Sequence, residues 1–189
     1  MLHERVRVGD LLNISAPKNH FALAHGAQHS ILLAGGIGVT PLLCMAERLA
    51  ITGASFEMHY CTRSRERTAF ASRIEAAPFA RLVAFHHDDG ADDQKLALGA
   101  VLSRPRPGVH VYVCGPKGFM DWVLESAHQH GWPADQLHCE FFTADVVTSE
   151  QDASFEVQLA SSGKVIAVSQ HQTVVQALGG RRYRSGHVM

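Results

Sequence analysis

Apolar residues in the middle of the chain follow two patterns that alternate. Runs that are apolar nearly throughout, such as SILLAGG at 30–36, are typical of buried strands, and each precedes a stretch in which apolar residues recur every three or four positions. After the first run, the residues expected on one helical face are Leu42, Leu43, Ala46, Leu49 and Ala50. We therefore expect buried strands that alternate with amphipathic helices.

The same order of strand and helix recurs along residues 28–142. Further strands are expected at 56–64, 81–89 and 109–116, and a short apolar run at 137–142 is expected to be the last strand. The helical stretches between them are 67–77, 95–103 and 117–131. Strands joined by helices are typical of parallel sheets with helices on both faces. The pattern predicts an α/β fold with a doubly wound, five-stranded parallel sheet.

The segments on either side have a different pattern. Residues 1–27 combine short alternating runs with turn residues, which predicts an antiparallel hairpin over 4–23 and the end of a separate β domain. A polar linker is expected at 143–153. Residues 154–180 predict a second partial unit, with a hairpin that turns at SSGK and a helix that begins at TVVQAL. The final residues, 181–189, are interpreted as an unrelated tail.

The composition is that of an ordinary globular protein. With 46% hydrophobic residues, 19% charged residues and a formal net charge of -1, the chain shows no basic excess, so nucleic acid is not an expected partner. No apolar run is long enough to span a bilayer and no secretory signal is visible, so a cytoplasmic location without a membrane is expected. The four cysteines lack C-x-x-C spacing and are expected to be reduced, mostly buried thiols: Cys44, Cys61, Cys114 and Cys139.

A glycine-rich turn, AGGIGVTP at 34–41, connects the first strand to the first helix. Glycines at such a place let backbone N–H groups approach an anion, and the helix dipole adds attraction, so a diphosphate is the natural ligand. Thr40 is expected to be the N-cap and Pro41 the first helical residue. A tight structural turn is the alternative. The turn matches neither G-x-G-x-x-G nor the P-loop pattern.

Two more strand ends carry suitable residues. YVCGPKGFM at 112–120 brings Cys114, Gly115 and Pro116 to the carboxyl edge of the sheet, where ligands of open α/β sheets bind. YCTRSRER at the end of another strand offers groups for a ribose or its phosphate: Arg63, Ser64, Arg65 and Arg67. The run HHDDGADD at 86–93 could hold a metal, but a solvated acidic loop is expected, because adjacent strand side chains point apart.

In this order and spacing, AGGIGVTP, Y-x-x-R-S and V-C-G-P-x-x-x-M resemble the pyridine-nucleotide domain of the ferredoxin reductase superfamily. The flanks are similar to those of the phthalate dioxygenase reductase group, which includes vanillate demethylase reductases. The resemblance implies that residues 1–27 are a remnant of a flavin-binding β-barrel and that residues 154–180 are part of a β-grasp, 2Fe-2S ferredoxin-like domain. In particular, G-D and I-S-x-P-x-N-x-F resemble the last strands of that group's flavin domain. The resemblance covers residues 3–178, and relative to this group the chain is expected to be truncated at both ends.

The resemblance implies an NADH-dependent reductase component of an aromatic-ring or O-demethylating oxygenase. It implies that electrons pass from NADH through FMN and a plant-type 2Fe-2S cluster to a Rieske-type oxygenase component. Cys114 beside the nicotinamide and Thr40 toward the flavin are the implied catalytic residues. The implied cofactor-binding residues are Gly35, Gly36, Gly38, Thr40, Arg63, Ser64, Cys114, Gly115, Pro116, Met120, Glu140 and Phe142.

Several of these roles have simpler alternatives. Cys114 could be a small core residue and Arg63 a solvated charge. Phe141 and Phe142 could fill the core, and at most one of them can face a flavin, because alternate strand side chains point to opposite faces. NADH is expected rather than NADPH: the neighbouring arginines could pair with a 2′-phosphate, but Glu66 lies among them.

Two features of the group are missing from the chain. In the group, the strands that hold FMN come before the position that corresponds to residue 3. In this sequence, no cysteine follows Cys139 that could ligate a cluster. FMN binding is therefore expected to be weak and the 2Fe-2S cluster absent. The alternative function is an isolated nucleotide-binding fragment without electron transfer, and a third hypothesis is a non-redox anion-binding domain.

Overall fold

The computed structural model describes residues 2–142 and 153–179. The chain divides into two compact units, Met1–Phe142 and Thr143–Met189, and each is described by itself. The linker predicted at 143–153, apart from Ala153, and the tail predicted at 181–189 lie outside the described residues. Within the described ranges, no helix has the length and apolar character needed to cross a bilayer.

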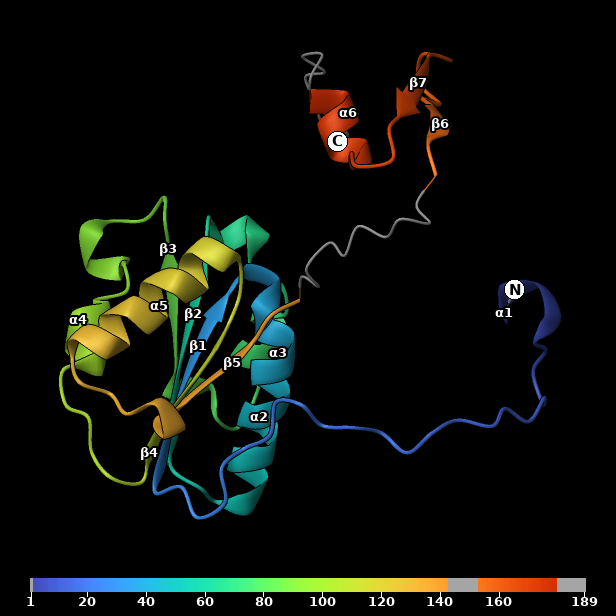
Figure 1. Ribbon diagram of the computed structural model, residues 1–189. Coiled ribbons are helices and arrows are strands. Elements are labelled where there is room, and N and C mark those ends of the chain that lie inside the picture. Colours follow the sequence, from blue (N-terminus) through green and yellow to red (C-terminus); the bar gives the residue numbers. More distant parts are fainter. Residues whose placement is uncertain (1, 143–152, 180–189) are drawn as a thin grey trace. The chain divides into compact units, whose positions relative to one another are not determined.

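The first unit is built on one parallel sheet (Figure 1). From central β1 the chain adds β2 and β3 on one side, then crosses over to add β4 and β5 on the other, which gives the order β3-β2-β1-β4-β5. Neighbouring strands are parallel throughout. The strands are β1 (His29–Gly35), β2 (Phe56–Thr62), β3 (Val83–His87), β4 (Val109–Cys114) and β5 (Leu137–Glu140). The predicted doubly wound, five-stranded sheet is confirmed.

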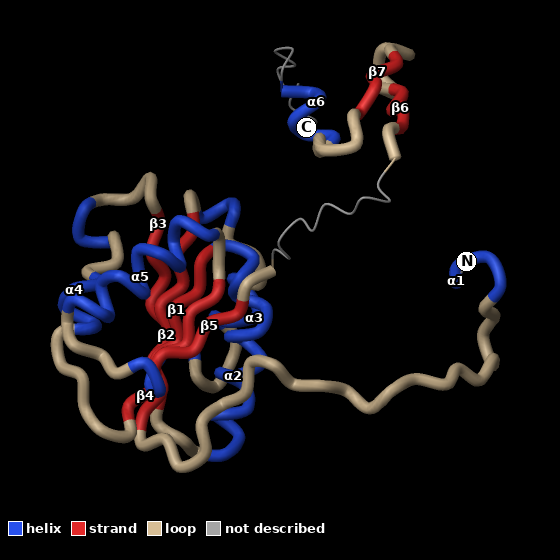
Figure 2. Tube along the Cα trace, in the orientation of Figure 1, coloured by secondary structure: helices blue, strands red, loops and turns tan. Residues whose placement is uncertain are grey.

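Helices lie on both faces of this sheet (Figure 2). One core joins α2 and α3 to strand residues such as Leu32 and Met58, and the other joins α4 and α5 to residues such as Leu33 and Val111. The helices of this unit are α1 (Leu2–Arg5), α2 (Val39–Thr52), α3 (Ala71–Glu75), α4 (Leu98–Leu102) and α5 (Lys117–Gln129). Its 3-10 turns are η1 (Gly36–Gly38), η2 (Arg65–Arg67), η3 (Ala80–Leu82), η4 (Asp92–Gln94) and η5 (Ala134–Gln136).

Burial along the elements follows their place in the sheet. The predicted face of α2 is confirmed, since Leu42, Leu43, Ala46 and Leu49 are all buried. Strand β1 is buried on both faces, whereas β2 alternates buried and half-buried residues. The helices of the second core pack mainly over β1 and β4, so the same face of β2 is less completely covered. Helices α3 and α4 are shorter than the stretches predicted for them.

The hairpin predicted over 4–23 is wrong. After α1 the chain has no strand before β1, and residues 4–20 are exposed. Strand backbone needs a neighbouring strand for its hydrogen bonds, and none lies beside this segment among the described residues. The segment first packs at Phe21, whose ring meets Tyr112 edge-on at 6.0 Å, and the Ala24 N–H then donates to the Tyr112 hydroxyl at 2.8 Å.

The second unit contains the predicted hairpin and helix. Strands β6 (Phe155–Gln158) and β7 (Val165–Val168) pair antiparallel, and α6 (Val174–Gly179) follows. Val168 is buried, whereas Phe155 and Val165 are about half exposed. The assignment of this unit to a partial ferredoxin domain stays a prediction.

Two histidine pairs connect inner strands to the edges of the sheet. His59 Nδ1 of β2 lies 3.0 Å from His86 Nε2 of β3, and His110 Nδ1 of β4 lies 3.0 Å from His138 Nε2 of β5. The rings in each pair are stacked, with centroids 5.3 Å and 5.2 Å apart. Each edge strand is therefore attached by a side-chain hydrogen bond in addition to its backbone ladder.

The Gln94 carbonyl group determines which ring nitrogens carry the protons in the first pair, His59 and His86. His86 Nδ1 lies 2.9 Å from the Gln94 carbonyl, which only accepts, so this nitrogen carries a proton. In the neutral ring His86 Nε2 then accepts from His59 Nδ1–H, which leaves His59 Nε2 as a buried nitrogen without a hydrogen-bond partner, 4.0 Å from Glu57. Burial lowers the pKa of His59 more than Glu57 raises it.

We expect the histidine pairs to make the fold less stable in mild acid. Burial, and then the neighbouring His110, lowers the pKa of His138 as well. Because the unfolded chain takes up these protons first as the pH falls through the ordinary value of 6.5, stability is lost below that value. The midpoint of thermal unfolding should be lower at about pH 5.5 than at about pH 7.5. His59→Gln should reduce the difference, and His20→Gln in the exposed segment should not; equal pH dependence in all three proteins would contradict this.

Candidate functional site

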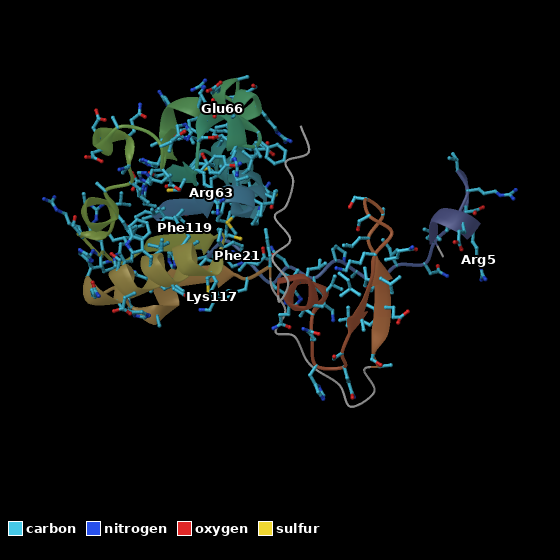
Figure 3. All side chains as sticks on the ribbon, turned by 90° about the horizontal axis from the view of Figure 1, so that it is seen from above. Arg5, Phe21, Arg63, Glu66, Lys117 and Phe119 are labelled. Atoms are coloured by element: carbon cyan, nitrogen blue, oxygen red, sulfur yellow. The ribbon has the colours of Figure 1, made fainter. Side chains whose placement is uncertain are left out.

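A cavity of about 310 Å³ opens at the carboxyl edge of the sheet, the edge toward the viewer in Figure 3. Its lining comes from the β1–α2 turn, the end of β2, the loop after β3 and the start of α5. The lining residues are Gly35, Gly36, Cys61, Thr62, Arg63, Arg67, Asp88, Pro116 and Phe119. Ligands of doubly wound sheets bind at this edge. The cavity therefore has the position predicted for a binding site.

The glycines of the two turns serve different purposes. A Cβ on Gly38 would collide with the Cys114 carbonyl, and one on Gly115 would lie 2.9 Å from the Gly35 Cα, so these glycines let the β1–α2 and β4–α5 turns touch backbone to backbone. Gly36 differs, because its φ is +51° and nothing lies within 4 Å of its Cβ position. The glycine turn therefore has close backbone packing, as the structural alternative expects, and one backbone position, Gly36, that is open to the cavity, as anion binding would need.

The prediction that Thr40 caps α2 is wrong. The 3-10 turn η1 runs directly into the helix, so Val39 is already helical and Gly38 occupies the cap position without a side-chain hydrogen bond. The exposed Thr40 hydroxyl donates instead to the Ile37 carbonyl at 3.1 Å. Pro41 consequently lies within the first turn of α2 and is not its first residue.

Two residues of the β4–α5 segment are core residues. Cys114 is completely buried and packs in the first core, and burial, followed by the charge of Glu140, raises the pKa of its thiol to about 11. Met120 is completely buried in the second core. Neither lines the cavity, whereas Pro116 between them does. The Cys114 thiol is therefore neutral at physiological pH and lies under the turn.

The arginines after β2 are divided between two tasks. Arg65 forms an ion pair with Glu75 at 3.0 Å. Arg63 and Arg67 line the cavity, and within the described ranges neither has an acidic partner. The Ser64 hydroxyl hydrogen-bonds the fully exposed Glu66 and, after a backbone hydrogen bond, helps to lower the pKa of that carboxyl group. Two cations are therefore available to a ligand.

The residues expected near a flavin lie at a second cavity or at the surface. Glu140 lines a cavity of about 650 Å³ together with Phe21, Pro41 and Met45. Phe141 and Phe142 are 50% and 53% exposed, so the alternative that they fill the core is wrong. The expectation of mostly buried cysteines is also only half right, because Cys44 on α2 and Cys139 on edge strand β5 are exposed.

Sequence reasoning missed four lining residues, Cys61, Thr62, Asp88 and Phe119. The Phe119 ring occupies the space beside two glycines, since a Cβ on Gly35 would lie 2.7 Å from its Cδ1 atom. In the sequence Phe119 was part of a helical apolar pattern, which hid this position. Asp88 belongs to HHDDGADD, and its place just after a strand was the available signal. Among the described residues, no three His, Cys, Asp or Glu side chains are arranged to hold a metal ion.

Comparison with known proteins identifies relatives over nearly the whole chain. A model of the family described as dimethylamine monooxygenase subunit DmmA-like, N-terminal domain, matches residues 15–137. The vanillate O-demethylase oxidoreductase of Pseudomonas sp. (strain HR199 / DSM 7063) is 48% identical over 177 residues, 94% of this chain and 56% of that protein. The phthalate 4,5-dioxygenase oxygenase reductase subunit of Pseudomonas putida is 37% identical over 92% of this chain and 53% of that protein.

A solved structure shows the same similarity. Phthalate dioxygenase reductase, described as a modular structure for electron transfer from pyridine nucleotides to 2Fe-2S, has a TM-score of 0.64 and 34% identity. The match covers 90% of this chain and 54% of that one. The chain thus spans little more than half the length of these relatives.

Two alanine substitutions separate the two roles of the glycines. Gly38→Ala is expected to destabilise the fold by about 3 kcal/mol, because backbone must move to admit the Cβ. Gly36→Ala should cost only about 1 kcal/mol, the strain of its left-handed backbone, since its Cβ meets open space. Denaturant unfolding of both variants measures the difference; a Gly38→Ala cost no larger than that of Gly36→Ala would show that the turns are not in contact.

Proposed function

The chain belongs to the family of dimethylamine monooxygenase subunit DmmA-like N-terminal domains, and on this premise we propose that it is the pyridine-nucleotide module of an oxygenase reductase. The resemblance to the phthalate dioxygenase reductase group is confirmed, since its relatives are named as oxidoreductases or reductases of oxygenase systems. In the proposed function, NADH binds in the cavity and its electrons pass toward an oxygenase component of the Rieske type.

The observation that carries this proposal is an open backbone turn beside two unpartnered arginines. Gly36 exposes its backbone to the cavity at the beginning of the 14-residue helix α2, whose dipole favours an anion there. Arg63 and Arg67 line the same cavity and can form charge-assisted hydrogen bonds. Together they fit a dinucleotide diphosphate, which carries two negative charges and needs donors that approach closely.

The other residues have separate roles in this proposal. Pro116, beside Gly115, borders the space for the nicotinamide, where a bulky side chain would exclude the ring. Cys114 supports that turn as a neutral, buried thiol. Thr40 and Glu140 are assigned in this proposal to the side on which a flavin would bind. A bound NADH would supply a hydride, for which a flavin would be the acceptor. The chain's own residues bind and orient the donor.

The residues present do not fit a 2Fe-2S cluster. A plant-type cluster needs three cysteines spaced C-x-x-x-x-C-x-x-C and a distant fourth, and the four cysteines of this sequence are isolated from one another. This observation favours a second candidate function for these residues, nucleotide binding without electron transfer. Both functions require the same dinucleotide site, and they differ only in whether electron transfer takes place after binding.

Binding should depend on the open glycine. Gly36→Leu is expected to weaken NADH binding by about tenfold or more, because the side chain would enter the cavity. Gly53→Leu is the matched control: Gly53 also has a left-handed backbone, φ +68°, with open space around its Cβ, but it lies at the far end of α2. Calorimetric titration of the purified chain measures both. Equal loss in both variants, or no binding to the folded wild-type chain, would contradict the proposed site.

An electron-transfer assay separates the two functions. The purified chain mixed with NADH and FMN is expected to reduce ferricyanide faster than NADH and FMN alone, because a bound nicotinamide is held in one orientation. The Gly36→Leu variant should lose this acceleration. A chain that binds NADH without any acceleration would support nucleotide binding without electron transfer.

A further inference from the structure

Asp88 introduces a negative charge into a cavity whose other charged groups are cationic. It directly follows β3 and lines the cavity with Arg63 and Arg67. Across the described part of the chain, none of these three side chains has an ion-pair partner. Burial, and then the negative charge of Asp88, raises the pKa of the Cys61 thiol to about 12. The Asp88 carboxylate therefore interacts electrostatically with Cys61, which is another lining residue of the cavity.

Backbone hydrogen bonds hold Asp88 beside the end of β2. The Asp88 N–H donates to the Thr62 carbonyl at 3.0 Å, and the Asp89 N–H donates to the Arg63 carbonyl at 3.2 Å. These bonds continue the pairing of β2 with β3 beyond its last residue pair, Thr62 and His87. Asp88 and Arg63 therefore keep a constant spacing at the edge of the sheet.

A buried side-chain network fixes the surrounding loop. The Thr62 hydroxyl lies 2.8 Å from the Thr68 hydroxyl and 2.9 Å from His87 Nδ1. The Thr68 hydroxyl in turn donates to the Ser64 carbonyl at 3.0 Å. Thr62 and Thr68 are 6% and 9% exposed, so water competes little for these bonds. The network joins the ends of both strands to the turn that carries Arg67.

The charges in the cavity match a dinucleotide with a free 2′-hydroxyl, such as NADH, better than one with a 2′-phosphate, such as NADPH. Arg63 and Arg67 balance the two charges of a diphosphate, and the cations on the adjoining turns are already engaged, Arg65 with Glu75 and Lys117 with an aspartate one turn along α5. A 2′-phosphate would bring up to two more negative charges toward Asp88 without a further free cation. A ribose hydroxyl can instead donate to the carboxylate.

We propose that Asp88 selects the dinucleotide at this site, accepting a hydrogen bond from the free 2′-hydroxyl of the adenosine ribose and repelling a 2′-phosphate. The inference rests on the proposed function, because it assumes that the cavity holds the adenosine half of a pyridine dinucleotide. It makes Asp88 the residue that favours NADH over NADPH, against the attraction that Arg63 and Arg67 offer to any phosphate.

The test compares ADP-ribose with ADP-ribose 2′-phosphate in calorimetric titrations of the full chain. Wild-type protein is expected to bind ADP-ribose about tenfold or more tightly than its 2′-phosphate. Asp88→Asn preserves the side-chain shape and should bring the two affinities to within about threefold, mainly by strengthening binding of the 2′-phosphate. Asp89→Asn removes the same charge at the next residue, which does not line the cavity, and should keep the wild-type ratio.

Each result has a distinct meaning. A ratio that changes in Asp88→Asn and not in Asp89→Asn supports the assignment. If wild-type protein binds ADP-ribose but Asp88→Asn leaves the ratio unchanged, or Asp89→Asn changes it equally, Asp88 is not the selecting residue and the proposed function stands. Tighter wild-type binding of the 2′-phosphate overturns the assignment in the same way. If the folded wild-type chain binds neither compound, the proposed function itself fails and the inference with it.

Discussion

The backbone of the β1–α2 turn rests against the backbone of the β4–α5 turn, and the geometry of the cleft depends on this contact. Strands β1 and β4 are neighbours in the sheet, so their turns leave the same edge side by side. Only glycine at 38 and at 115 lets the two turns come this close, because a Cβ at either position would meet backbone atoms. Phe119 then packs against Gly35 and completes the wall. The contact leaves Gly36 as the position where the turn is open to a ligand.

The other side of the cleft is organised by hydrogen bonds and charge. Strand β2 ends beside β1 and β3 ends beside β2, and the buried Thr62 hydroxyl connects the ends of β2 and β3 to the following turn. Glu75 engages Arg65, which leaves Arg63 and Arg67 for the cavity. The side of the cleft formed by the β1–α2 and β4–α5 turns therefore depends on glycines that let two backbones touch. The side formed by the ends of β2 and β3 depends on charged side chains whose positions are set by strand pairing.

Periodicity was sufficient to predict the elements that form the sheet and its main helices. The strands of the first unit and the buried face of α2 follow from apolar repeats, because burial against a neighbouring layer requires that spacing. The errors arise where structure depends on a partner. The hairpin expected over 4–23 lacks a neighbouring strand, and the expected Thr40 cap is displaced because η1 makes the chain helical one residue earlier.

By itself, the sequence determined the fold class, the edge of the sheet where the cavity opens, and the kinds of residue gathered there, since apolar spacing and motif order are local properties of the chain. The tertiary structure decided how each residue is used. What folding places against each residue decides three things: whether a glycine leaves space for a ligand or contacts a neighbouring turn, which arginine has no acidic partner, and whether Met120 lies at a cofactor or in the core. Asp88 enters the cleft for the same reason: the pairing of β3 with β2 carries it there.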